Sequence, residues 1–324
     1  MAYATTNPAT GETVKTFETA TDEQIRDAVA RSAKEYTSWR TVPVAERARL
    51  MHTMAGLYRD REDELAALIT EEMGKQLAQS VEEVRLVADI YDYYADNAEE
   101  FMKGRTLTPS TGGEARVVLD STGVLLGIMP WNFPYYQVAR FAAPNVMLGN
   151  TVLLKHAGNV PQAALVQEEL FRDAGFPEDV YINIFASNEQ IADIVIPDPA
   201  VQGVSLTGSE RAGSAVAAAA GKNLKKVVLE LGGSDPFIVL DAENVERTVK
   251  QGVFGRMLNN GQACTNSKRF IVLEEAYDAF VENFAQAVQG VTPGDPMDQK
   301  TFLGPLCAVE ARDEIMEQGQ DCLL

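Results

Sequence analysis

The sequence has few of the residues that build disulfide frameworks, zinc sites or membrane spans. Its 324 residues include three cysteines at irregular spacing and two histidines, which favours neither a disulfide framework nor a metal site. We therefore expect a reducing compartment, the cytoplasm. The first residues lack the basic and apolar regions of a signal peptide. No apolar run approaches the ~20 residues that cross a bilayer, so no membrane partner is expected.

Basic residues are scarce as well. The chain has 28 lysines and arginines against 47 acidic residues, a net charge of −19. Nucleic acids and anionic membranes bind basic faces, so neither is expected as a partner. The acidity favours solubility and does not bear on the reaction.

The usual dinucleotide fingerprint is also absent. No two glycines are separated by a single residue, which excludes G-x-G-x-x-G. A nucleotide can still bind at Thr-Gly-Ser 207–209, where a predicted strand meets a predicted helix. Ser209 is a good N-cap, and the free N–H groups and dipole of a helix N-terminus attract phosphate. Most such junctions only cap a helix, so this pattern alone leaves both interpretations open.

The apolar pattern predicts an α/β protein. Helical spacing indicates helices over 22–39, 46–58, 62–73 and about 79–102. Segments 115–120 and 124–129 flank a turn and read as a hairpin. Short apolar runs then alternate with helical segments, as in a doubly wound parallel sheet. The expected strands are 124–129, 151–155, 181–185, 201–207 and 226–231, and the helices are 138–148, 161–174, 189–196 and 209–220. A second α/β unit, with elements over 236–241, 245–257, 269–273 and 276–288, follows Gly232 and Gly233.

Three segments carry side chains suited to catalysis. Asn132 lies in Pro-Trp-Asn-Phe-Pro at 130–134, directly after a predicted strand, where α/β sheets bind ligands. Glu230 lies at an apolar strand end, where burial would make it a usable base near neutral pH. Cys264 lies in the polar segment Gly-Gln-Ala-Cys-Thr-Asn at 261–266. Taken singly, each has an ordinary explanation: an inert cysteine, a glutamate that reaches water and an asparagine in a turn.

Taken together, these segments resemble the aldehyde dehydrogenase superfamily. The resemblance runs from about Asn7 to about Pro305. It rests on Pro-Trp-Asn-Phe-Pro at 130–134, Leu-Leu-Lys at 153–155, Thr-Gly-Ser at 207–209, Leu-Glu-Leu-Gly-Gly at 229–233 and Gly-Gln-Ala-Cys at 261–264. It implies a dinucleotide-binding domain over 1–107 and 124–231, a partial oligomerisation hairpin over 108–123 and an incomplete catalytic domain over 232–324.

The resemblance also implies a role for each catalytic residue. Cys264 is the nucleophile that forms a thiohemiacetal with the aldehyde. Asn132 and the backbone N–H of Cys264 form the oxyanion hole. Glu230 is the general base for the water that hydrolyses the thioester, and it can deprotonate Cys264.

The resemblance implies a nicotinamide cofactor. Lys155 would contact the adenosine ribose, Ser209 the pyrophosphate, and Gly213 would let its helix pack closely. Gly158 stands where many members carry Glu or Ser, so NAD is expected through the subfamily resemblance, with NADP not excluded. The full set of expected cofactor-binding residues is Pro130, Trp131, Lys155, Gly158, Gly208, Ser209, Gly213 and Leu231.

Within the superfamily the sequence is most similar to bacterial succinate-semialdehyde dehydrogenases of the NAD-preferring branch, in segments 153–157 and 231–239. Arg140 stands where these enzymes face the distal carboxylate of the substrate, which a guanidinium binds with paired hydrogen bonds. The alternative for Arg140 is an ion pair within the protein. Leu258 replaces a second substrate-binding arginine of some members.

The chain ends at Leu324, inside the second predicted unit. The family is homo-oligomeric, and the absence of its closing strand argues against that assembly here. One alternative is therefore a fragment or short paralogue that only binds cofactor. Another is a Cys264-dependent hydrolase, disfavoured because only His52 and His156 are available as its base.

Overall fold

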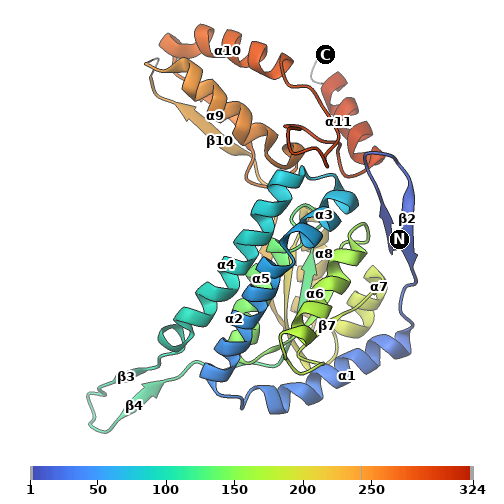
Figure 1. Cartoon of the computed structure of the whole chain (residues 1–324). Coiled ribbons are helices and arrows are strands. Elements are labelled where there is room, and N and C mark those ends of the chain that lie inside the picture. The colour runs from blue at the N-terminus through green and yellow to red at the C-terminus, as the bar shows by residue number, and fades with distance from the viewer. Residues whose placement is uncertain (1–2, 242, 322–324) are drawn as a thin grey trace.

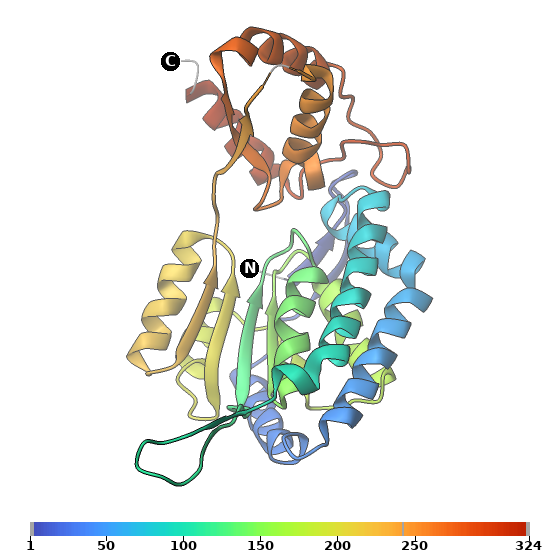
Figure 2. The same ribbon diagram turned by 90° about the vertical axis from the view of Figure 1, so that its left-hand side faces the viewer.

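Five parallel strands form the central sheet of the protein, whose computed structural model describes residues 3–241 and 243–321. The strand order is β7-β6-β5-β8-β9. The chain adds strands on one side of β5 as far as β7 and then crosses to the other side for β8, so the order reverses between β5 and β8 (Figure 2). This confirms the predicted doubly wound sheet. The strands are β5 (Val124–Met129), β6 (Thr151–His156), β7 (Tyr181–Asn183), β8 (Val201–Thr207) and β9 (Lys226–Glu230).

Helices cover both faces of this sheet (Figure 1). Leu126 and Leu153 belong to the core of one face, and Val152 and Leu154 to the core of the other, as the alternation of side chains along a strand requires. The first face is covered by α1 (Asp22–Trp39), α7 (Asn188–Gln190), the π-helix η1 (Ile191–Val195) and α8 (Glu210–Lys222). The second is covered by α2 (Val44–Asp60), α3 (Glu62–Met73), α4 (Leu77–Phe101), α5 (Tyr136–Leu148) and α6 (Pro161–Asp173).

Local capping explains where several helices begin and end. Thr21 and Gln24 form a reciprocal capping box at the start of α1. Gly74, with φ +77°, ends α3 in the left-handed conformation that glycine adopts readily. The predicted helix bounds agree with the observed ones to within a few residues, apart from 189–196, which α7 and the π-helix share.

The predicted hairpin between 115–120 and 124–129 is wrong. β4 (Ala115–Val117) pairs antiparallel with β3 (Arg105–Leu107), and the two form an arm beyond the end of α4 (Figure 1). Both edges of β5 are already bonded to β6 and β8, so β5 has no free edge for β4. The N-terminal ribbon of β1 (Tyr3–Thr6) and β2 (Thr13–Phe17) was not predicted, because its strands are too short to show a clear alternation.

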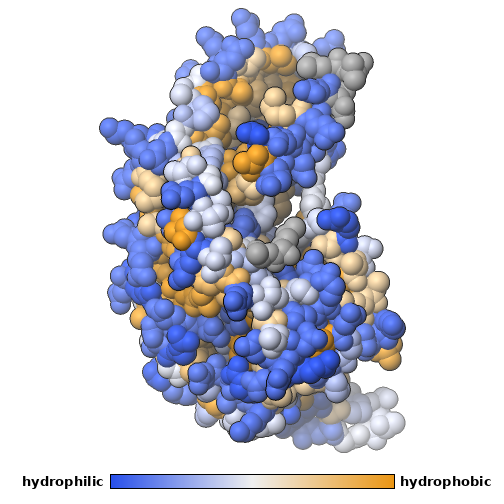
Figure 3. All heavy atoms as spheres, turned by 90° about the vertical axis from the view of Figure 1, so that its right-hand side faces the viewer, coloured by the Kyte–Doolittle hydropathy of each residue, from blue (hydrophilic) through white to orange (hydrophobic). Residues whose placement is uncertain are grey.

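A second α/β unit follows the sheet. β10 (Asp235–Val239) and β11 (Ser267–Val272) pair in parallel, and α9 (Val245–Met257) and α10 (Glu274–Gln289) pack with them. The short turn η2 (Leu258–Gly261) lies between α9 and β11, and α11 (Val309–Asp321) follows. In Figure 3 hydrophilic residues predominate, as the acidic composition suggests, and hydrophobic ones gather in part of this unit, at the top. No helix in the described ranges is long and apolar enough to span a membrane.

Candidate active site

The strands that lead into most of the predicted site residues end at one edge of the sheet. Met129 at the end of β5 lies beside His156 at the end of β6, and Thr207 at the end of β8 lies beside Glu230 at the end of β9. These are carboxyl ends, and the strand order reverses between β5 and β8. Ligands of open α/β sheets bind at such a point.

Asn132 is hydrogen-bonded to the segment that carries Cys264. Its Nδ2 donates to the backbone oxygen of Gln262 at 2.9 Å. A carbonyl oxygen only accepts, so this contact fixes which side-chain atom is the nitrogen. Asn132 Oδ1 is buried and has no hydrogen-bond partner among the described residues. The second Nδ2 hydrogen is free to donate to a ligand.

A left-handed turn precedes Cys264. Asn259, Asn260 and Gly261 have φ of 53°, 58° and 78°, a region in which glycine and asparagine are the common residues. Asn260 Nδ2 holds the turn by donating to the backbone oxygens of Gly74 and Pro305, at 2.7 and 2.8 Å. Cys264 follows the turn with an exposed, free thiol.

Glu230 is not buried, so the predicted burial is wrong. Its side chain is 56% exposed, and Oε2 lies 3.8 Å from Nη1 of Arg140. The strand order contributes to this exposure, because among the described residues β9 is the edge strand of the sheet and pairs with β8 alone. Arg140 also donates from Nη2 to Thr207 Oγ1 at 3.2 Å. The ion pair that was the alternative for Arg140 is therefore present, and it lies at the carboxyl edge.

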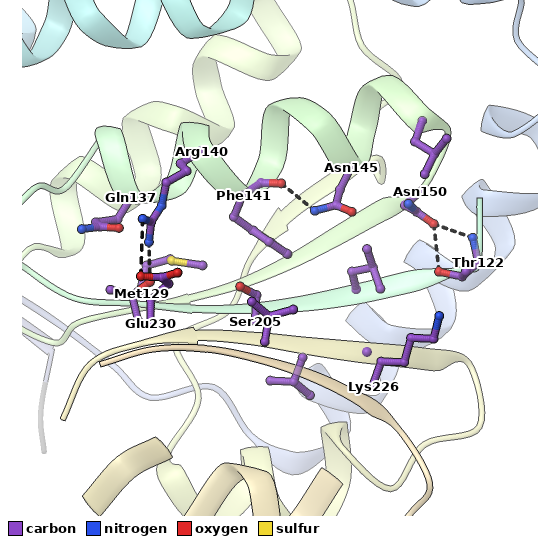
Figure 4. Close-up of a pocket in the computed structure, with 16 residues that line it drawn as sticks. Thr122, Met129, Gln137, Arg140, Phe141, Asn145, Asn150, Ser205, Lys226 and Glu230 are labelled. Carbon is purple, nitrogen blue, oxygen red and sulfur yellow. Dashed lines mark hydrogen bonds and ion pairs between the residues drawn. The ribbon is translucent and has the colours of Figure 1, made fainter. Parts of the chain in front are cut away.

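Arg140 and Glu230 lie at one end of a cavity of about 470 Å³ between α5 and strands β8 and β9 (Figure 4). Asn150, Thr122 and Lys226 lie at the other end. Gln137 of α5 also lines this cavity, and its buried Oε1 has no partner in the described part of the chain. The sequence did not single out Gln137, whose only signal is its place one helical turn before Arg140. The remaining surface is mostly apolar, lined by Leu125, Met129, Phe141, Leu148, Val204 and Val228.

On the opposite face, the start of α8 carries several of the expected cofactor-binding residues. Ser209 caps the helix by accepting from the N–H of Ala212 at 3.2 Å. A Cβ on Gly213 would lie 2.6 Å from Leu231 Cδ2, closer than atoms tolerate. Helix and loop therefore touch at a point where a side chain at 213 would displace the side chain of Leu231. Gly208 donates its N–H to the backbone oxygen of Glu230 at 3.0 Å, which joins this junction to the end of β9.

The other expected cofactor residues follow β5 and β6. Lys155 is half-buried, and this burial lowers the pKa of its ammonium group. It has no ion pair among the described residues, so its charge is available to a ligand. Gly158 accepts a hydrogen bond from the N–H of Ala4 at 2.9 Å through its backbone oxygen. Pro130 and Trp131 follow β5 directly, and the indole packs against the core.

Neither histidine is placed to act with Cys264. Both ring nitrogens of His156 are bonded, Nε2 to the backbone oxygen of Pro134 and Nδ1 to the N–H of Ala157, each at 2.8 Å. Burial lowers the pKa of His156 to about 4. His52 lies on α2 with Asp92 of α4, at 2.6 Å. A hydrolase with a histidine base therefore gains no support.

Residues 1–322 match the aldehyde dehydrogenase family. The chain belongs to this family. A succinate-semialdehyde dehydrogenase [NADP(+)] of Deinococcus radiodurans is 52% identical over 99% of this chain and 67% of its own length. One of Mycobacterium ulcerans is 44% identical over 99% of this chain and 70% of its own. The crystal structure of succinic semialdehyde dehydrogenase from Streptococcus pyogenes with NADP+ has a TM-score of 0.95 at 43% identity, over 98% of this chain and 70% of that one.

The matches confirm the family, fold and activity predicted from the sequence. This aldehyde dehydrogenase oxidises an aldehyde to a carboxylic acid and transfers a hydride to NAD(P). The chain spans about two thirds of the length of the relatives it matches. The individual site residues and the domain bounds stay predictions.

Proposed function

We propose that this aldehyde dehydrogenase oxidises succinate semialdehyde, a short aldehyde with a carboxylate at its other end. Arg140 carries the proposal. Its guanidinium reaches a mostly apolar cavity at the carboxyl edge of the sheet, next to Glu230. Arg140 now contacts one oxygen of Glu230 and the hydroxyl of Thr207. The carboxylate of a substrate would offer it two acceptor oxygens side by side. The names of the relatives support the same substrate.

In this proposal Cys264 and Asn132 act together on the aldehyde. Cys264 Sγ attacks the carbonyl carbon as a thiolate, and the carbonyl oxygen becomes an oxyanion. The free Nδ2 hydrogen of Asn132 and the N–H of Cys264 stabilise that charge, the kind of interaction that is usually worth ~2.7–4 kcal/mol of the barrier. The fixed bond from Asn132 to Gln262 orients the amide before substrate arrives.

The nicotinamide dinucleotide, when bound, supplies the acceptor for the aldehyde hydride. Four residues fit its adenosine and phosphate groups. Lys155 offers a cation without an ion pair, Ser209 caps a helix N-terminus, and Gly213 packs against Leu231 without a side chain of its own. Pro130, Trp131, Gly158 and Gly208 complete the proposed site.

Glu230 acts last. The thioester on Cys264 is attacked by water, Glu230 takes the proton of that water, and the carboxylic acid and the Cys264 thiol are released. Substrate binding to Arg140 frees Glu230 from its ion pair for this step, because both groups share the end of the cavity.

We propose that the cofactor is NADP, which the sequence did not exclude, in place of the NAD expected from it. Gly158 carries no carboxylate that would repel a 2′-phosphate, and the names of the relatives support NADP. The dinucleotide-binding domain is proposed to comprise 1–107 and 124–231, with 108–123 as the oligomerisation hairpin and 232–324 as the catalytic domain.

The test follows reduced cofactor by absorbance with succinate semialdehyde and with butanal, which has the same chain length and no carboxylate. Wild type should prefer succinate semialdehyde and NADP, and Cys264→Ala should be inactive. Arg140→Leu should raise KM for succinate semialdehyde at least tenfold and leave KM for butanal unchanged. Arg26→Leu, which changes an exposed arginine of α1, is the matched control. Equal kcat/KM for the two aldehydes in wild type would refute the substrate assignment.

A further inference from the structure

One face at the start of α4 is bonded to both loops of the proposed catalytic centre. Gln79 and Glu83 are four residues apart and share that face. Gln79 Oε1 accepts from the backbone N–H of Asn259 at 2.7 Å. Glu83 Oε1 accepts from the backbone N–H groups of Tyr135 and Tyr136 at 2.9 and 3.0 Å. The helix therefore holds both the chain after β5 and the turn before Cys264.

The Glu83 end of this face is a buried anchor. Lys75 is fully buried, forms an ion pair with Glu83 Oε2 and lies with Nζ 3.7 Å from the centroid of the Phe133 ring. Burial lowers the pKa of Lys75, and the charge of Glu83 acts in the opposite direction. Separating a buried ion pair leaves a charge without a partner, which strongly destabilises a protein. The pair therefore fixes α4 against Phe133, the residue next to Asn132.

The Gln79 end leads to Asn132 through a single residue. Asn259 receives the bond from Gln79 at its N–H and donates from Nδ2 to the backbone oxygen of Asn132 at 2.7 Å. Asn132 in turn donates from Nδ2 to Gln262, two residues before Cys264. Gln79 is thus two hydrogen bonds away from the backbone of the proposed oxyanion donor.

We propose that Gln79 is a positioning residue, which acts through Asn259 to hold the Asn132 amide against Cys264. This inference rests on the proposed roles of Asn132 and Cys264. An oxyanion donor works only within a few tenths of an ångström of its required place, and a 1 Å displacement costs up to a hundredfold in rate. Asn259 is held in a left-handed conformation (φ 53°), so the bond from Gln79 helps to keep the turn in register.

The experiment compares two reactions of Cys264 that need no nucleotide. Acylation by p-nitrophenyl acetate passes through a tetrahedral oxyanion, whereas alkylation by iodoacetamide does not. Gln79→Leu removes the acceptor at similar size, and Gln79→Glu keeps it. We expect Gln79→Leu to slow the Cys264-dependent acylation burst roughly 10- to 100-fold, by analogy with other displaced oxyanion donors, while alkylation changes less than twofold. Gln79→Glu should retain most of the acylation rate.

Three controls make the result specific. Cys264→Ala gives the background from other nucleophiles. Gln251→Leu changes an exposed glutamine of α9 and should leave both reactions at the wild-type rate. Gln79→Ala removes the acceptor without introducing a large apolar group. It should show the same selective loss of acylation, and it replaces Gln79→Leu if that variant does not fold.

The decisive comparison is made in an Asn132→Ala background. If Gln79 acts through Asn132, Gln79→Leu causes no further loss of acylation there, because residues that act together are not additive. A full, additive loss, or an equal loss of acylation and alkylation, would overturn the proposal. So would a wild-type chain without Cys264-dependent acylation. Failure to reduce NADP with succinate semialdehyde would refute the proposed substrate and cofactor alone, because acylation requires neither.

Discussion

Asn132 donates its side-chain Nδ2 to the backbone oxygen of Gln262, across 130 residues of sequence and 2.9 Å of space. The bond joins the end of β5 in the five-stranded sheet to the turn before Cys264. The proposed oxyanion donor and the proposed nucleophile therefore come from two separate α/β units, and their relative position depends on contacts between those units.

The first prediction concerns this amide. Asn132→Ala should lower kcat about 10²- to 10³-fold, the usual cost of losing one oxyanion donor, and leave KM for NADP unchanged. Steady-state kinetics measure both. Asn97→Ala, which removes an amide bonded only within α4, is the matched control. A kcat within threefold of wild type would show that Asn132 is not the donor.

The second prediction concerns the contact between α8 and the loop after β9. In Gly213→Ala the new Cβ would lie 2.6 Å from Leu231 Cδ2, so the leucine side chain must move. We expect KM for NADP to rise roughly 3- to 10-fold, about 0.7–1.4 kcal/mol, with little change in thermal midpoint.

The partner variant Leu231→Ala removes the atom that collides. Adding Gly213→Ala to it should therefore have no further effect, because the two residues act at one contact. Additive effects of the two substitutions would point to a different cause.

The third prediction concerns the cofactor phosphate. Gly158→Glu places a carboxylate after the end of β6, where we propose that NADP binds. KM for NADP should rise about tenfold, roughly 1.4 kcal/mol, because a carboxylate repels a 2′-phosphate. KM for NAD, which lacks that phosphate, should not rise. An equal increase for both cofactors would place Gly158 away from the ribose.

The fourth prediction is a pH dependence of stability. Glu72 on α3 is fully buried and accepts from Thr5 Oγ1 and from the N–H groups of Gln162 and Ala163 at the start of α6. Burial raises the pKa of Glu72 from 4.5 to about 7, although these hydrogen bonds act in the opposite direction. The folded state thus favours the neutral carboxyl, and its contribution to stability is complete below pH 4.5 and is lost as pH rises to about 7.

Glu72→Gln removes the titrating group, so that side chain stays neutral at every pH, at the constant cost of one acceptor oxygen. Urea unfolding should show wild type losing stability relative to Glu72→Gln between pH 5 and pH 7, by on the order of 1–3 kcal/mol. Glu99→Gln, which changes an exposed glutamate of α4, should show no such trend. A wild type that gains stability relative to Glu72→Gln over this range would contradict the prediction.

The sequence predicted elements that are defined locally. Helical spacing located α1, α3 and α9 to the residue, and buried apolar runs located β5 and β8. The exposure of Glu230 was not predictable in this way, because a run of valines and leucines reads the same in an edge strand as in a central one. Only the strand order shows that β9 has a single neighbour.

The same limit applies to the catalytic centre. Segments around Asn132 and Cys264 were recognisable as motifs. Gln79 carries no such signal, because its partner Asn259 lies 180 residues further along the chain. Nothing in the local pattern of an amphipathic helix distinguishes a glutamine that meets solvent from one that accepts a hydrogen bond from a distant turn.

The turn before Cys264 also bears on chemical ageing. Asn260 is followed by Gly261, and its Nδ2 donates to the backbone oxygens of Gly74 and Pro305. Asparagine is a thermolabile residue, which loses its amide by deamidation. The product would set a carboxylate oxygen against two carbonyl oxygens and leave no donor between them. The contact that holds the turn before Cys264 thus depends on an amide with a finite chemical lifetime. In stored protein this turn should become disordered before the core does.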